Sequence, residues 1–265
     1  MLDRDFDSLL TRIADFTTRN RIVMSSIGST NAVGKRIASF YHRNGEQLAQ
    51  TVVIAMEQTA GRGRLGNRWS SPEGGIYVSL VLPDLDYNAM AVLPMRVATA
   101  LCRQLDAILD RPCRVKWPND MMVEGQKIGG ILIETVGTHQ HASAVIGFGV
   151  NYAASPMELG AGATCVLATS WQAPEKVEVT ARLILALEEI SSTPLEAAGV
   201  VEEYSQWSQH KMDEDILCRT ASGAQSGRFL GFDERGFLRL LTSRGEELIS
   251  AGEVLEGAGV GHHES

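Results

Sequence analysis

Hydrophobic and polar positions follow two different periods along the chain as far as residue 209. Apolar residues spaced three or four positions apart predict amphipathic helices, whereas alternating or continuous β-branched runs predict strands. The predicted helices cover residues 6–18, 30–43, 88–109 and, as two segments, 178–209. The predicted strands cover residues 21–27, 50–58, 76–83, 113–123, 127–136 and 142–152. Because many of these strands are joined by hairpin turns, the pattern favours an α+β fold over a repeating parallel βαβ sheet.

The pattern changes near residue 212. Four short strand-like segments follow, and Ser-Gly, Glu-Arg-Gly and Arg-Gly turns separate them. Short strands at this spacing are typical of a small β-barrel. We therefore expect a larger domain over residues 1–212, a small β-barrel domain over residues 213–257 and a tail over residues 258–265.

Composition and charge place the chain among globular proteins. Of its 265 residues, 44% are apolar and 21% are charged, and the formal net charge is −8. No run of Lys or Arg is dense enough for a nucleic-acid face, so the charge indicates a solvated acidic surface. The acidic N-terminus is neither a signal nor a transit peptide, and no apolar run approaches the ~20 residues of a membrane span. The four cysteines form no Cys-x-x-Cys pair, which fits a reducing cytoplasm.

The first candidate for chemistry is the sequence GRGRLG at residues 61–66, which matches the dinucleotide fingerprint G-x-G-x-x-G. That fingerprint requires a helix to begin within the glycines, because the pyrophosphate binds at the helix N-terminus. The following residues, NRWSSPEGG, contain Pro72 and a Gly pair and predict no helix. The segment GSTNAVGKR at residues 28–36 is not a P-loop either, because its glycines are too far apart and Arg36 replaces Ser or Thr.

The loop at residues 61–66 nevertheless offers groups that bind anions. Glycine lets backbone N–H groups approach an anion closely. Arg62, Arg64 and Arg68 add planar cations that suit phosphate or carboxylate. From this loop alone, an anion site and a solvated basic hairpin are equally good interpretations.

A second cluster, KWPND at residues 116–120 followed by KIGG at residues 127–130, favours the anion site. The proline forces the preceding tryptophan into an extended conformation and holds the chain rigid. Lys116 supplies a charge for phosphate oxygens, and Asp120 with Asn119 beside it is suited to position Mg²⁺ or a hydroxyl. The glycine pair removes side chains where a ligand can lie on the sheet. Surface lysines and a simple turn explain this combination poorly.

Together these motifs resemble those of the bacterial biotin–protein ligases. Four of them occur in that family's order and spacing: Ser29-Thr30-Asn31 after a strand, Gln58-Thr59 with GRGRLGNRW, KWPND with Lys127-x-Gly-Gly, and GFGVNY at residues 147–152. The resemblance covers about residues 20–155 strongly and the C-terminal segment loosely. It implies a mixed-sheet biotin/lipoate ligase-like catalytic domain and a small C-terminal SH3-like β-barrel. Lipoate ligases share this fold but lack the pairing of GRGR-x-G with KWPND.

The resemblance implies a two-step reaction. Biotin and ATP give biotinyl-5′-adenylate and pyrophosphate, and a lysine of the biotin carboxyl carrier domain of acetyl-CoA carboxylase or a related carboxylase then displaces AMP. The charge that develops requires cations, so the implied catalytic set is Arg64, Lys116, Lys127 and Asp120, the last as a Mg²⁺ ligand. The implied biotin-binding residues are Ser29, Thr30, Asn31, Gln58, Arg62, Gly63, Arg64, Lys127 and Gly129. The implied nucleotide-binding residues are Arg64, Trp69, Lys116, Asn119 and Asn151.

The resemblance also gives expectations about closure of the glycine loop and about binding partners. The glycine loop is expected to close as a lid that shields the reactive anhydride from water. Some family members carry an N-terminal helix-turn-helix, but only 28 residues precede Ser29 and they hold one helical pattern, so we expect no DNA binding. We expect a cytoplasmic monomer or homodimer with no membrane partner. If two copies pair through an edge strand, IYVSLVL or GFGVNY is the candidate strand.

Two alternatives to this function remain open from the sequence. A lipoate or octanoate ligase or transferase on the same fold needs a deeper apolar cavity, which sequence does not measure. A non-catalytic biotin-binding protein does not need so many phosphate-directed cations. His139 and His141 are interpreted as an exposed turn rather than a metal site, and His262 and His263 as a disordered end.

Overall fold

A computed structural model of the chain describes residues 20–85, 90–138, 142–153, 155–156, 162–193 and 196–255. The helix predicted over residues 6–18, the two histidine pairs and the C-terminal tail lie outside these residues. Among the helices within them, none is long and apolar enough to cross a membrane.

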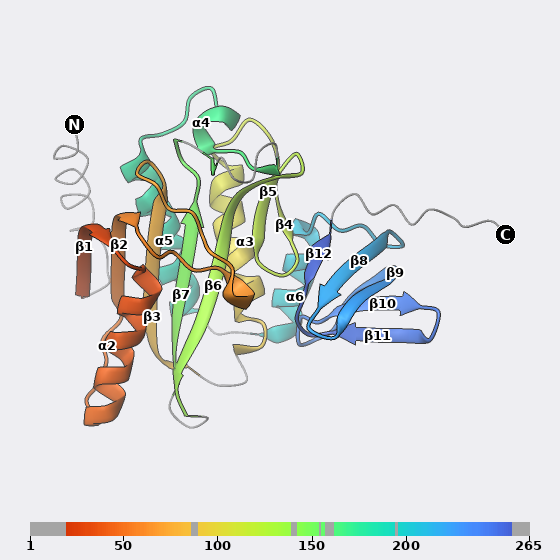
Figure 1. Ribbon diagram of the computed structural model, residues 1–265, viewed down its shortest axis with the longest axis horizontal. Helices are drawn as coiled ribbons and strands as arrows, with labels where there is room; N and C mark the ends of the chain where they lie inside the picture. The colour runs from red at the N-terminus through yellow and green to blue at the C-terminus, as the bar shows by residue number, and fades with distance from the viewer. Residues whose placement is uncertain are drawn as a thin grey trace.

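The larger part of the chain forms a seven-stranded mixed sheet (Figure 1). Its strands are β1 (Asn20–Ile27), β2 (Thr51–Gln58), β3 (Ile76–Leu85), β4 (Cys113–Lys116), β5 (Asp120–Val123), β6 (Gln126–Gly137) and β7 (Ala142–Val150). The strand order is β1-β2-β3-β7-β6-β5-β4. Strand β1 pairs with β2 in parallel, and the remaining neighbours are antiparallel. This arrangement is the mixed-sheet α+β fold that the sequence predicted.

Helices cover both faces of this sheet. They are α2 (Thr30–Asn44), α3 (Leu93–Asp106), α4 (Val166–Thr169), α5 (Lys176–Ser192) and α6 (Ala197–Trp207). Helices α3 and α5 pack against each other on one face, and α2 crosses the opposite face (Figure 1). Gly34 and Ala38 let α2 approach Val81 and Val145 closely. Strand β7 lies between these layers and is buried along its whole length.

The ends of α2 follow the predicted pattern. Ser29 occupies the N-cap position in an extended conformation, and the left-handed Gly45 (φ 64°) ends the helix. The Ser29 side chain makes no capping hydrogen bond. Ser29 is instead one of the residues that line the cavity described below.

The C-terminal part of the chain forms a second, antiparallel sheet, consistent with the predicted SH3-like domain. Its strands are β8 (Asp215–Thr220), β9 (Gly223–Phe232), β10 (Leu238–Thr242), β11 (Gly245–Ile249) and β12 (Glu253–Leu255), in the order β11-β10-β9-β8-β12. Phe232 packs edge-on against Tyr204 of α6, with ring centroids 5.1 Å apart. The two sheets are therefore joined by a shared apolar core.

Two predicted elements differ from those observed. The strand predicted over residues 113–123 is a hairpin of β4 and β5, because Pro118 has no N–H to donate to a continuous ladder. The helix predicted over residues 88–109 begins at Leu93 and ends at Asp106. Proline is accommodated in the first turn of a helix, so Pro94 marks the start of α3 rather than its second turn.

The predicted edges for pairing are wrong. The segment IYVSLVL lies in β3, between β2 and β7, and GFGV lies in β7, between β3 and β6. Both strands are interior, and the edges of the sheet are β1 and β4. Continuous apolar runs of this kind are typical of strands that are buried on both faces.

Candidate active site

A cavity of about 1030 Å³ opens beside the sheet. Its walls come from the start of α2, the loop between β2 and β3, the β4–β5 hairpin and the adjoining part of β6 and β7. Gly252 and Glu253 of the C-terminal sheet complete one side. The volume is that of a site for a drug-sized ligand or larger.

One end of the cavity is polar and buried. Ser29, Thr30 and Asn31 at the start of α2 are each 4% exposed. The Ser79 hydroxyl in β3 lies 2.8 Å from Thr30 Oγ1 and 2.6 Å from Asn31 Oδ1. Gln58 Oε1 accepts hydrogen bonds from the Thr30 backbone N–H and hydroxyl, at 2.9 and 3.2 Å. This end therefore presents hydroxyl and amide groups whose positions are fixed by one another.

The Asn31 side chain forms part of the wall. Its Nδ2 donates to Leu132 O and to Glu134 Oε2, both at 3.1 Å, while its Oδ1 accepts from Ser79. A Cβ atom at residue 147 would overlap Asn31 Oδ1. The first glycine of GFGVN is thus required because Asn31 occupies the space that a side chain would fill.

A chain of hydrogen bonds connects this polar end to the glycine loop. Gln58 Nε2 donates to the Ser71 hydroxyl at 2.9 Å, and that hydroxyl donates to Trp69 O at 3.2 Å. Trp69 N also donates to Gly61 O at 3.0 Å. A Cβ atom at Gly61 would lie 2.6 Å from Ser71 Oγ, so glycine is needed at this crossing. The position of Trp69 therefore depends on the same Gln58 side chain that contacts Thr30.

Trp69 packs against β6 and β7. Its ring occupies the space above Gly130 and Gly149, where added Cβ atoms would come within 3.0 and 2.5 Å of the indole. The Lys127 ammonium lies 5.2 Å from the ring centroid. The indole Nε1 is buried without a hydrogen-bond partner among the described residues. Two strand glycines thus create an aromatic surface inside the cavity.

The cations of the cavity converge from three elements. Lys116 from β4, Lys127 from β6 and Arg64 from the glycine loop all line it. The Lys127 ammonium forms an ion pair with Asp120 at 2.6 Å, and both side chains are about a quarter exposed (24% and 23%). The described residues contain no cluster of three His, Cys, Asp or Glu side chains suited to a metal ion.

Arg64 links the glycine loop to the β4–β5 hairpin and to the segment that precedes β12. Its guanidinium donates to Asn119 Oδ1 at 3.1 Å and to Gly252 O at 3.4 Å. Burial lowers the pKa of Arg64 from its ordinary value, and the nearby Asp120 carboxylate opposes that shift. The guanidinium stays charged in either case, since its ordinary pKa lies far above neutrality. The loop is therefore fastened across the cavity by a cation that faces its interior.

Not every expected site residue lies where the sequence placed it. Most of the set lines the cavity: Ser29, Thr30, Asn31, Gln58, Arg62, Gly63, Arg64, Trp69, Lys116, Asn119, Asp120 and Lys127. Gly129 does not, because its missing side chain leaves room for Met121, and Gly130 faces the cavity instead. Asn151 lies behind the cavity, where its Nδ2 donates to Lys127 O and Thr164 O at 3.3 and 3.0 Å. Asn151 thus holds the strand that carries Lys127.

Sequence reasoning missed several residues of this site. Ser79 sits within an apolar run, and only the register of β3 against α2 brings it to Thr30. Ser71 lies in a loop that carries no recognisable element. The roles of Gly147 and Gly149 follow from what packs over them, Asn31 and Trp69. The alternation of glycines in GFGVN was a usable signal, because it leaves one face of the strand bare.

Comparison with known proteins agrees with this geometry. A model of the biotin/lipoate A/B protein ligase family matches residues 24–151. The chain is 34% identical to the biotin–[acetyl-CoA-carboxylase] ligase of Paracoccus denitrificans over 216 residues, which is 77% of this chain and 90% of that protein. It is 29% identical to the bifunctional ligase/repressor BirA of Bacillus spizizenii, over 88% of this chain and 73% of that protein.

Solved structures show the same fold. The biotin protein ligase from Aquifex aeolicus in complex with biotin and ATP superimposes with a TM-score of 0.69 at 24% identity, over 89% of this chain and 98% of that one. The biotin protein ligase from Leishmania major in complex with biotinyl-5-AMP gives a TM-score of 0.60, over 88% of this chain and 99% of that one. At these identities the likeness establishes the architecture.

Proposed function

Because the chain belongs to the family of biotin–protein ligases, its reaction is the ATP-dependent ligation of biotin to protein, and we propose that the cavity carries out both steps. One observation carries this proposal. A buried polar end, an aromatic surface and a set of cations line the same cavity. These are the three environments that an acid with a polar head group, a purine and a triphosphate require.

The polar end suits the ureido ring of biotin. A buried ureido group needs both donors and acceptors. The hydroxyls of Ser29 and Thr30 and the second Nε2–H of Gln58 can supply them, since Gln58 Oε1 and its other Nε2–H already bind Thr30 and Ser71. Asn31 shapes the wall, since its own amide is already engaged. Ile131 and Phe148 line the cavity beside this end and offer apolar contact for the rest of biotin.

The aromatic surface suits the adenine of ATP. Trp69 packs against Gly130 and Gly149, and a planar base gains stacking energy on an indole ring. The Gln58–Ser71–Trp69 hydrogen bonds connect this surface to the biotin end. Occupation of the biotin end would therefore help to fix the surface on which the nucleotide binds.

The first step joins biotin to AMP. A carboxylate oxygen of biotin attacks the α-phosphorus of ATP, the bond from that phosphorus to the oxygen bridging to the β-phosphate breaks, and pyrophosphate leaves. Two anions approach each other, so cations must stabilise the transition state. Lys116, Lys127 and Arg64 come from three different elements, line the same cavity and are candidates for this role.

Asp120 holds Lys127 ready for this step. The 2.6 Å ion pair fixes the ammonium over the Trp69 ring before substrates arrive. A partly exposed pair is weak, about 0–1 kcal/mol, so a phosphate or carboxylate oxygen can take the place of Asp120. Because the Lys127 ammonium is already oriented, it needs little reorganisation during the reaction.

The residues fit a Mg²⁺ ion that arrives with ATP rather than a resident ion. Mg²⁺ is commonly held by substrate phosphates and one or two carboxylates, and Asp120 is a carboxylate within the cavity. When bound, the ion would neutralise charge on the phosphates. Asp120 would then exchange Lys127 for the ion.

The second step transfers biotin to the partner. The amine of a carrier lysine attacks the acyl carbon of the adenylate, the acyl–oxygen bond breaks and AMP leaves. Until then the anhydride must be kept from water. Arg64 closes the glycine loop against Asn119 and Gly252, and we assign this contact the role of a lid. The partner implied by the relatives' names is the biotin carrier of acetyl-CoA carboxylase or a related carboxylase.

Four free, buried cysteines support a reducing compartment such as the cytoplasm as the site of this reaction.

Lipoate is the acid to compare with biotin, because the family model covers both biotin and lipoate ligases. The thermal stability of the protein separates the two. A ligand at a thousand times its Kd adds about 4 kcal/mol of stability. A large increase for biotin with Mg-ATP, and none for lipoate with Mg-ATP, is the expected result; the same increase with lipoate would overturn the choice of acid.

A further inference from the structure

Trp117 of the KWPND motif is held by residues that follow α6. Its side chain is buried, at 3% exposure. Its backbone N–H donates to His210 Nε2 at 3.1 Å, and its indole Nε1 donates to Gly236 O at 3.1 Å. Both acceptors are about a hundred residues away in the sequence. The hairpin that carries the motif is thus fastened from behind by the C-terminal part of the chain.

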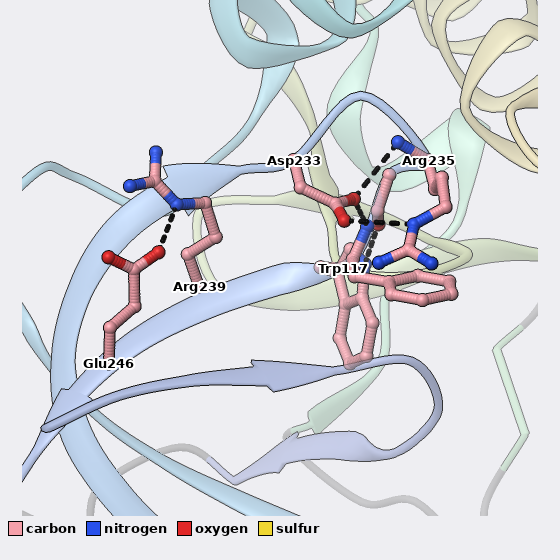
Figure 2. A network of polar contacts seen from close by, with 7 residues as sticks. Trp117, Asp233, Arg235, Arg239 and Glu246 are labelled. Carbon is pink, nitrogen blue, oxygen red and sulfur yellow. Dashed lines mark hydrogen bonds and ion pairs between the residues drawn. The ribbon is translucent and has the colours of Figure 1, made fainter.

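The acceptor for the indole belongs to a turn that Asp233 shapes. Residues 233–237 connect β9 to β10. Asp233 Oδ1 accepts hydrogen bonds from the backbone N–H groups of Arg235 and Phe237, at 3.0 and 2.8 Å. Its Oδ2 accepts from Arg235 Nε at 3.2 Å (Figure 2). One carboxylate therefore fixes the residues on either side of Gly236.

The turn also packs against helix α3. Gly236 adopts a left-handed conformation (φ 80°), and an added Cβ atom would lie 2.8 Å from the Met95 sulfur of α3. Gly236 N donates to Asp233 O at 2.9 Å. The carbonyl that receives the indole is therefore held by the turn on one side and by α3 on the other.

The residues beside Trp117 are those of the proposed chemistry. Lys116 precedes it and lines the cavity. Asn119 accepts a hydrogen bond from Arg64, and Asp120 pairs with Lys127. A displacement of Trp117 would move all of them together, because the hairpin is short. Misplacement of about 1 Å at a catalytic group can cost about 100-fold in rate.

We propose that Asp233 is a positioning residue for adenylate formation, which acts through the turn at residues 233–237 and the indole of Trp117. It touches no substrate. By ordering the turn, it presents Gly236 O to Trp117 and so sets the position of Lys116, Asn119 and Asp120. This inference rests on the proposed function for its kinetic consequence, but its structural link is testable without it.

The test compares three variants of the full-length protein. Asp233→Ala removes the acceptor of both backbone N–H groups, whereas Asp233→Asn retains an oxygen at that place. Glu246→Gln is the matched control, because Glu246 also accepts from an arginine Nε, that of Arg239 at 2.7 Å, but lies on β11 away from the turn (Figure 2). We expect Asp233→Ala to lower kcat for biotin-dependent pyrophosphate release about tenfold to 100-fold, with biotin affinity retained. Asp233→Asn and Glu246→Gln should stay near wild type.

A double-mutant cycle with Trp117→Phe tests the route. That substitution keeps an aromatic ring and removes the indole N–H. If Asp233 acts through this hydrogen bond, Asp233→Ala should add little to the effect of Trp117→Phe. Full additivity of the two effects, or an unchanged kcat in Asp233→Ala, would overturn the proposal.

A spectroscopic readout separates this inference from the proposed function. The indole N–H resonance of Trp117 is assigned by its absence in Trp117→Phe. It should shift in Asp233→Ala and stay in place in Glu246→Gln. An unmoved resonance in Asp233→Ala contradicts the positioning role, whatever the activity. If the wild-type protein releases no pyrophosphate with biotin and Mg-ATP, that result would instead count against the proposed function.

Discussion

The ammonium of Lys127 in β6 lies 2.6 Å from the carboxylate of Asp120 in the neighbouring strand β5. The same ammonium lies over the ring of Trp69. The pair is too accessible to add much to stability. Its consequence is positional, because it holds the lysine ammonium beside the aromatic surface of the cavity.

Replacement of this lysine should affect chemistry more than folding. We expect Lys127→Gln to lower kcat for biotin-dependent pyrophosphate release by about 100-fold or more, as loss of one transition-state cation does. Stability should change by less than about 1 kcal/mol. Lys211→Gln, at an exposed position, is the control for loss of a positive charge. Equal activity of the two variants would remove Lys127 from the catalytic set.

A side chain at residue 147 should damage the biotin end selectively. In Gly147→Ala the added methyl overlaps Asn31 Oδ1 and must displace it. We expect biotin affinity to fall at least about tenfold and stability to fall by ~1–3 kcal/mol, as for other overpacked cores. Isothermal titration with biotin and thermal unfolding measure both effects.

The control for that substitution is Gly199→Ala in α6, an exposed site with nothing within 4 Å of the new methyl. It should leave biotin binding unchanged and raise stability by ~0.5–1 kcal/mol, since alanine favours a helix. Wild-type biotin affinity in Gly147→Ala would show that Asn31 does not shape the biotin end.

A side chain at Gly149, the next glycine on the same face of β7, should weaken nucleotide binding instead. Gly149→Ala places a methyl 2.5 Å from the Trp69 indole and lifts the ring from the sheet. We expect KM for ATP to rise about tenfold, while binding of biotin alone changes little. Initial rates at varied ATP, with biotin saturating, measure this. A variant that loses biotin affinity and keeps its KM for ATP would reverse the assignment of the two ends.

The lid role of Arg64 predicts leakage of the intermediate. Arg64→Ala removes the hydrogen bonds to Asn119 and Gly252 that fasten the loop. We expect the variant to keep its fold and to release free biotinyl-adenylate faster than wild type. Chromatography of the reaction mixture without carrier quantifies it. Release at the wild-type rate would mean that Arg64 does not retain the adenylate.

The sequence predicted the parts of this site that lie in local motifs. GRGRLGNRW, KWPND and the start of α2 each carry their chemistry within a few residues, and the sheet brings them to one cavity. The interior polar residue Ser79 was not predicted, because the alternation of β3 gives no sign of what packs against it. Its role depends on α2, which arrives from a different part of the chain.

Which of the adjacent glycines, Gly129 or Gly130, faces the cavity also depends on the register of the strands. An irregularity between Met121 and Met122 shifts the pairing of β5 with β6, so that Gly130 rather than Gly129 faces the cavity. A shift of one residue turns a side chain to the other face of a sheet. The contacts of Gly252 and Gly236 could not be predicted either, because each joins segments that are far apart in sequence.

If this cavity activates biotin with ATP, pyrophosphate must form before any carrier protein is present. The most direct measurement is pyrophosphate release by the wild-type protein with Mg-ATP and no carrier, with biotin and lipoate compared in parallel. We expect a burst of about one equivalent with biotin, followed by slow turnover while the adenylate stays bound, and no burst with lipoate. A burst with lipoate, or biotin binding without any pyrophosphate, would contradict it.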